Sequence, residues 1–155
     1  MKFTKIIFTA LSFLSVAAGA LHAQTPEKLI QNIMMDARES CVTVTYALSA
    51  VVDAVKIEDE GSVVAQGESW VLKGKSVDIY TNDEGTWVLS PEDKEAMVEP
   101  KWTYGDLETF YRSMLSAASG NNVSVRILSR TLSDRKPESY FKPVTGNDWV
   151  VTDLR

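Results

Sequence analysis

The stretch Gln66–Trp102, QGESWVLKGKSVDIYTNDEGTWVLSPEDKEAMVEPKW, decides the fold of this chain. It divides into short segments rich in β-branched and aromatic residues, separated by turn sequences such as Lys73-Gly74-Lys75 and Asn82-Asp83-Glu84-Gly85. Connections this short join antiparallel neighbours. Apolar residues occupy both alternating faces, although a sheet with one face in water needs only one apolar face. The stretch therefore predicts an antiparallel meander whose second apolar face needs a partner.

The rest of the chain supplies helices and further strands around this meander. Thr25-Pro26 starts a helix that ends near Glu39, because Thr is a good N-cap and Pro suits the first helical position. A second helix is expected over residues 103–120, with Gly120 as its stop. Strands are expected at residues 41–55, 63–73, 76–81, 86–90, 95–99, 123–131, 139–142 and 148–152, with an acidic turn at 56–62. The pattern predicts a single α+β domain with a curled antiparallel sheet and at least two helices on one face.

The N-terminus has the layout of a cleavable export signal. Lys2 and Lys5 precede an apolar run over residues 6–20, and Ala23 provides a small residue before Gln24. The run is too short for a comfortable membrane span, and no cysteine at the cleavage point marks the protein as a lipoprotein itself. We therefore expect a signal peptide over residues 1–23 and an exported domain over residues 24–155.

Charge and composition exclude several classes of function. Removal of residues 1–23 takes away two of the 16 basic residues and none of the 21 acidic ones, which leaves a formal net charge of −7. So acidic a chain is a poor partner for nucleic acid. The only histidine, His22, lies in the predicted signal peptide, and Cys41 is the only cysteine. Disulfides, the common zinc sites and histidine-dependent catalysis are therefore not expected.

Carboxylates are the remaining candidates for catalysis. Glycoside hydrolysis uses a pair of carboxylates, and the candidates for such a pair are Glu68, Asp78, Glu95 and Asp106. Nothing in their spacing singles out two of them as acid and base. The sequence therefore predicts a protein that is not an enzyme and that needs no cofactor or metal.

Three segments of the meander resemble the LolA-like periplasmic carriers of outer-membrane lipoproteins. Gln66–Val71 matches the family's glycine before a strand with an aromatic residue, and Asp83–Trp87 matches its aspartate-glycine turn before a tryptophan. Glu95–Val98 is similar to its short strand that opens with an acidic residue. The resemblance covers roughly residues 27–118. The chain departs from the pattern at Lys73, where the family commonly has a lid-locking arginine, and in its short C-terminal part.

This resemblance implies an answer to the question of the second apolar face. Members of the family have an incomplete β-barrel whose concave face is apolar and is covered by helices, and acyl chains of lipoproteins enter between them. The resemblance thus implies a periplasmic carrier with acylated lipoproteins or other apolar ligands as cargo, and with partner proteins at the inner and outer membranes. Burial of an acyl chain contributes about 0.8 kcal/mol per methylene and requires no catalytic group.

Candidate site residues follow from the apolar positions of the expected strands and of the second helix. They either line a lipid cavity or form an ordinary packed core. The residues are Val44, Tyr46, Leu48, Trp70, Leu72, Val77, Ile79, Trp87, Leu89, Leu107, Phe110 and Met114. Lys73 is the candidate gate residue, which either bonds the lid or is a solvated turn lysine.

Two alternatives to the carrier stay open at this point. In one, the same fold has a reduced or lost cavity and acts as a binding module through protein–protein contacts, with its aromatic residues fully buried and an apolar patch outside. In the other, the protein is a structural subunit of a surface assembly, marked by an unpaired last strand near residues 149–152.

Overall fold

A computed structural model describes residues 25–52, 54–114 and 123–155 of the protein. The predicted signal peptide and the predicted helix stop at Gly120 lie outside these residues. The described elements are α2 (Pro26–Ala37), β1 (Cys41–Val52), β2 (Val55–Gln66), β3 (Ser69–Lys73), β4 (Asp78–Asn82), β5 (Gly85–Ser90), β6 (Glu95–Glu99), α3 (Tyr104–Met114), β7 (Val123–Ser133), the 3-10 helix η3 (Glu138–Phe141) and β8 (Val150–Asp153).

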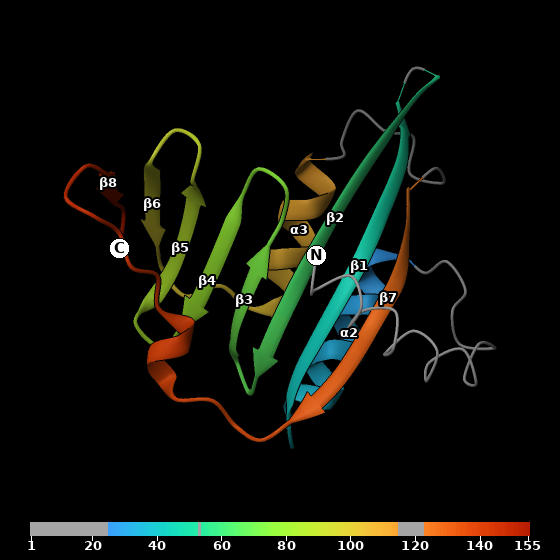
Figure 1. Ribbon diagram of the computed structural model, residues 1–155, viewed down its shortest axis with the longest axis horizontal. Coiled ribbons are helices and arrows are strands. Elements are labelled where there is room, and N and C mark those ends of the chain that lie inside the picture. The colour runs from blue at the N-terminus through green and yellow to red at the C-terminus, as the bar shows by residue number, and fades with distance from the viewer. Residues whose placement is uncertain (1–24, 53, 115–122) are drawn as a thin grey trace, which may run out of the picture.

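The strands form one sheet of eight in the order β7-β1-β2-β3-β4-β5-β6-β8 (Figure 1). All neighbours are antiparallel except β8, which pairs parallel with β6. The predicted α+β fold with a large, mostly antiparallel sheet and two helices is confirmed. The expected curl of the sheet is wrong: the sheet has free edges at β7 and β8, and it is neither closed nor strongly curled.

Three predicted elements differ from the structure. The expected strand over residues 63–73 is a hairpin, because Gly67 adopts a left-handed φ of 60° and turns the chain between β2 and β3. The acidic residues 56–62 form part of β2 rather than a turn, since pairing along the whole of β1 overrides their low strand propensity. The expected strand at residues 139–142 is the helix η3.

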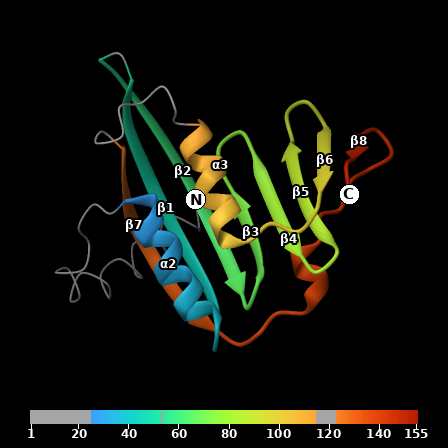
Figure 2. The same cartoon turned by 180° about the vertical axis from the view of Figure 1, so that it is seen from behind.

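The helices cover one face of the sheet, which we call the helix face. Figure 2 shows α2 and α3 in front of β1, β2, β3 and β7. Thr25 caps α2 by accepting a hydrogen bond from the backbone N–H of Lys28 at 3.3 Å, as predicted. Leu29, Ile33 and Leu107 on these helices are buried in one cluster with Val44 and Trp70 of the sheet. This cluster is the main core of the protein.

Gly61 allows the tightest packing on the helix face. It faces Tyr46 across the β1–β2 pair. A Cβ atom at this position would lie 2.5 Å from the Tyr46 hydroxyl oxygen and 2.7 Å from the backbone oxygen of Lys73. A larger residue at position 61 would clash with the Tyr46 ring, so glycine lets this buried ring stay in the core.

The C-terminal segment covers the opposite face of β3 to β6, which we call the second face. Phe141 of η3 is buried there with Val64 and Val71, and Trp149 packs against Trp87. The segment crosses the sheet on the side away from the helices before β8 joins the edge (Figure 1). The apolar residues on both faces of the meander are therefore explained by two covers, helices on one side and the chain's own C-terminus on the other.

Candidate functional site

A small apolar cavity lies between the two helices and the sheet. Its volume is about 30 Å³, which is far below the 300–1,000 Å³ or so of typical ligand pockets. All of its lining side chains are aliphatic except one tyrosine. They are Leu29, Ile30, Ile33, Tyr46, Leu48, Val63, Leu72, Leu107 and Val125. The cavity is therefore a small gap in a packed core, between the helices and the sheet.

Most of the predicted cavity residues gather on the helix face. Four of them line the cavity itself: Tyr46, Leu48, Leu72 and Leu107. Five others belong to the surrounding cluster or pack against it: Val44, Trp70, Val77, Ile79 and Phe110. The side chain of Met114 lies outside the described part of the structure. The alternation of apolar residues in β1 and β3 was the signal that located this group.

Trp87 and Leu89 are not part of this group. Trp87 pairs with Tyr80 and therefore points to the second face, whereas the adjacent Val88 pairs with Ile79 on the helix face. Leu89 follows Trp87 by two residues and shares its face. The structure thus separates Trp87 from Trp70, although both belong to the motif that suggested a shared cavity.

Lys73 does not reach the helices. It is exposed at the end of β3, where it shares the second face with Val71 and pairs with Asp78. The ion pair that ties a helix to the sheet is instead Arg130 of β7 with Asp36 of α2. Arg130 donates from Nη2 and Nε to the two carboxylate oxygens at 2.6 and 2.7 Å, and this contact raises the pKa of Arg130. A forked arginine contact to α2 is thus present, at a position that the sequence did not indicate.

An aromatic group adjoins the cavity at the start of α3. The Trp70 ring lies 6.5 Å from Trp102 and 6.3 Å from Tyr104, and Trp102 lies 5.4 Å from Phe110. The Trp102 indole donates a hydrogen bond to Glu99 at 2.7 Å. The Trp70 indole nitrogen is buried and has no partner among the described residues. The group contributes large apolar area, and one of its polar atoms is unpaired.

Tyr104 fixes the start of α3 on the sheet. Its hydroxyl donates a hydrogen bond to the backbone oxygen of Gly67 at 2.9 Å. Burial, with a smaller contribution from the negative charge of Glu68, raises the pKa of Tyr104 well above its ordinary value. The folded state therefore holds this proton more tightly than the unfolded chain does.

We expect Tyr104→Phe to lower the free energy of unfolding by about 1 kcal/mol at pH 7. Because the pKa of Tyr104 is higher in the folded state than in the unfolded chain, its contribution to stability is complete below the ordinary tyrosine pKa of about 10. This contribution is lost as the pH rises above that value. The difference between the wild type and the variant should therefore shrink between pH 7 and pH 10.5. Urea unfolding at the two pH values measures this difference, and a difference that does not change with pH would contradict the assignment.

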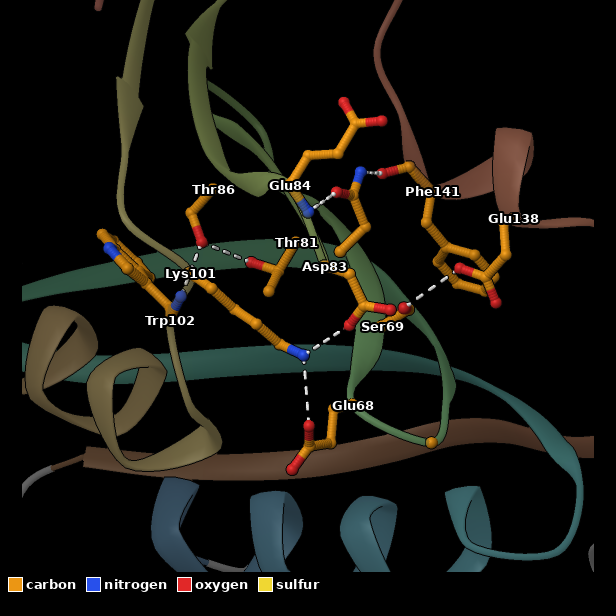
Figure 3. A network of polar contacts seen from close by, with 12 residues as sticks. Glu68, Ser69, Thr81, Asp83, Glu84, Thr86, Lys101, Trp102, Glu138 and Phe141 are labelled. Atoms are coloured by element: carbon orange, nitrogen blue, oxygen red, sulfur yellow. Dashed lines mark hydrogen bonds and ion pairs between the residues drawn. The ribbon is translucent and has the colours of Figure 1, made fainter. Parts of the chain in front are cut away.

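A polar network fixes the turns at one end of the sheet (Figure 3). The Lys101 ammonium binds Asp83 at 2.8 Å and Glu68 at 3.1 Å, which lowers the pKa of Asp83. Thr86 accepts a hydrogen bond from the backbone N–H of Trp102 at 2.8 Å and contacts Thr81 at 3.0 Å. These contacts join the β2–β3 and β4–β5 turns to the connection before α3, so the network positions that helix.

The four candidate catalytic carboxylates have separate surroundings. Glu68 binds Lys101, and Asp106 accepts the backbone N–H of Thr103 at 2.7 Å at the start of α3. Asp78 lies on the second face, where burial raises its pKa, and Glu95 is exposed on β6. Among the described residues no group of three or more histidine, cysteine, aspartate or glutamate side chains is placed to hold a metal ion.

A second, open groove lies on the helix face beyond the helices. Its volume is about 340 Å³, and it runs over β4, β5, β6 and β8. It is lined by Val77, Val88, Leu89, Ser90, Glu95, Ala96, Met97, Val150 and Thr152. Met97, Val150, Val151 and Leu154 are large apolar residues exposed on or beside its edge strands. This groove was not foreseen, because it depends on the parallel addition of β8.

Comparison of the chain with known protein families and with characterised proteins finds no match. The resemblance to LolA-like carriers therefore stays a similarity of short motifs. None of the helices in the described ranges has both the length and the apolar character needed to cross a membrane.

Proposed function

We propose that the protein is an exported carrier that shields acyl chains of lipoproteins, or similar apolar groups, in water. The observation that carries this proposal is the cavity between the helices and the sheet, whose nine lining residues present no charged side chain. Charged groups are costly in such a place, so an all-apolar lining suits a hydrocarbon ligand. The residues for which the resemblance implies ligand contact mostly surround this cavity.

On this proposal the described structure corresponds to the closed, ligand-free state. An open apolar cavity exposed to water is unfavourable, so the helices are expected to close on the sheet when no ligand is bound. The Arg130–Asp36 pair is partly exposed and contributes about 1 kcal/mol or less. Opening of α2 then costs free energy mainly because it exposes apolar side chains to water. Each methylene that the ligand buries offsets about 0.8 kcal/mol of this cost.

Export and delivery complete the proposed cycle. The N-terminal segment would direct the chain to the periplasm, where the open sheet and the two helices that cover it would hold the cargo between them. Partner proteins at the inner and outer membranes would load and unload it. Transfer needs only a higher affinity for the cargo in the acceptor than in the carrier, with no chemical step.

A titration with a triacylated lipopeptide tests the proposal. We expect residues 24–155 to show a saturable change in tryptophan fluorescence that comes mainly from Trp70 and Trp102, because ligand entry alters the surroundings of the indoles beside the cavity. The same peptide without acyl chains is the control and should give no change. The absence of a saturable change with the acylated peptide would refute the carrier proposal.

One observation favours a second candidate, a protein-binding module with a reduced cavity. Trp70 is fully buried, while the open groove over β4 to β8 presents exposed apolar residues such as Val150, which is 64% exposed. Exposed apolar grooves of this kind mark interaction surfaces. A module would leave the lipopeptide titration flat, so the same measurement separates the two candidates.

A further inference from the structure

The indole N–H of Trp70 is a buried hydrogen-bond donor without an acceptor. The side chain is 0% exposed, and no described residue accepts from its Nε1 atom. An indole nitrogen can only donate, and buried donors of this kind nearly always have a partner. The Trp102 indole in the same aromatic group does have one, the Glu99 carboxylate. The unpaired N–H of Trp70 is therefore an exception that calls for an explanation.

The position of Trp70 connects this donor to the cavity. Leu72 lies two residues along β3 on the same face, and it lines the cavity. Tyr104 stacks beside the Trp70 ring, and Leu107, one turn further along α3, also lines the cavity. Trp70 thus lies between β3 and α3 directly beside the cavity, although it is not one of the residues that line it.

The indole ring fills space in the aromatic group, but its N–H gains nothing from that packing. Burial of this donor without an acceptor costs free energy that a side chain without a donor would not lose. The nearby polar atoms already have partners, since Tyr104 donates to Gly67 and Trp102 donates to Glu99. An oxygen atom of a bound ligand would give the Trp70 N–H the acceptor that it lacks.

We infer that Trp70 donates a hydrogen bond to the carbonyl oxygen of an acyl ester or amide in the bound ligand. This inference rests on the proposed carrier function and narrows its ligand class. The cavity accepts a hydrocarbon chain that ends in a carbonyl in preference to a chain that has none. Trp70 then fixes how deeply the chain enters, because the carbonyl stops where the donor lies.

A matched pair of lipids tests this inference. Lysophosphatidylcholine with one lauroyl ester and its ether analogue have the same headgroup and chain length, and only the ester has a carbonyl. Binding of each below its micelle concentration is measured by displacement of an apolar fluorescent dye from the wild type and from Trp70→Phe. We expect the wild type to prefer the ester about five- to tenfold, and the variant to bind both lipids equally.

The outcomes separate this inference from the function on which it rests. Equal binding of ester and ether by the wild type, or an ester preference that survives in Trp70→Phe, overturns the role of Trp70 and leaves the carrier proposal standing. Failure of the wild type to bind either lipid overturns this inference, and the titration with the triacylated lipopeptide then decides the carrier proposal separately.

A second measurement is independent of the stability of the variant. The nitrogen-15 signal of the Trp70 indole N–H in the wild type, assigned through its bonded neighbours, should move downfield with the ester. The ether should leave this signal nearly in place. Equal shifts with both lipids overturn the inference.

Discussion

Replacement of Phe141 by alanine is expected to lower the free energy of unfolding by about 3–5 kcal/mol, the largest stability effect that we predict for a single site. Phe141 is 0% exposed and is the only residue of η3 that is buried within the cluster on the second face. Its backbone oxygen also accepts a hydrogen bond from the Asn82 side chain at 2.8 Å, which holds η3 against the β4–β5 turn. Loss of the ring therefore leaves a cavity and loosens the cover of that face.

Tyr140→Ala provides the matched control for this experiment. Tyr140 is the adjacent aromatic residue, but it is 43% exposed and lies against Lys136 and Phe141 at the surface. Its loss should cost about 1 kcal/mol or less. Urea unfolding of both variants gives the comparison, and limited proteolysis should cut the C-terminal segment faster in the Phe141 variant only. Equal costs for the two substitutions would show that the segment does not seal the second face.

Local signals in the sequence were enough to predict most elements of the fold. The start of α2 follows from Thr25 and Pro26, and the β4–β5 hairpin follows from the turn that ends at Gly85. These features depend on neighbouring residues, so one chain segment contains all the information needed. The alternation in β1 likewise identified the residues that face the helices.

Other features depend on pairing across the sheet, which local patterns do not contain. The length of each tight turn determines which residues of the next strand lie on which face of the sheet. Trp70 and Trp87 therefore lie on opposite faces, although both are motif residues. The Arg130–Asp36 contact joins residues 94 positions apart, and nothing near either one marks it. Sequence reasoning therefore located the main core correctly but assigned part of the second face to it.

The cover of the second face was the hardest feature to predict. Residues 134–149 are mostly polar and suggested only short strands, and nothing in them indicated that Phe141 and Trp149 cover the second face. The sequence therefore suggested covering helices and a ligand as partners for the apolar residues of the meander, and it did not suggest the C-terminal segment. The structure accounts for that excess through the C-terminal segment, so the case for a ligand depends on the helix face.

Two adjacent substitutions provide the sharpest test of where a ligand binds. Val63 lines the cavity on the helix face, whereas Val64 is buried on the second face beside Phe141. Val63→Phe and Val64→Phe add the same bulk to the same strand, and each should cost about 1–3 kcal/mol of stability. Only the first fills the cavity, so only Val63→Phe should weaken lipopeptide binding, by at least about tenfold, or 1.4 kcal/mol.

The tryptophan titration with the triacylated lipopeptide, repeated on both variants, measures this difference. Similar losses of stability in the two variants, checked by urea unfolding, would establish that overpacking affects both sides of the sheet equally. A loss of binding confined to Val63→Phe would then place the acyl chain between the helices and the sheet. Unchanged binding in both variants would contradict a site between the helices and the sheet and would favour the open groove over β4 to β8, which contains neither residue.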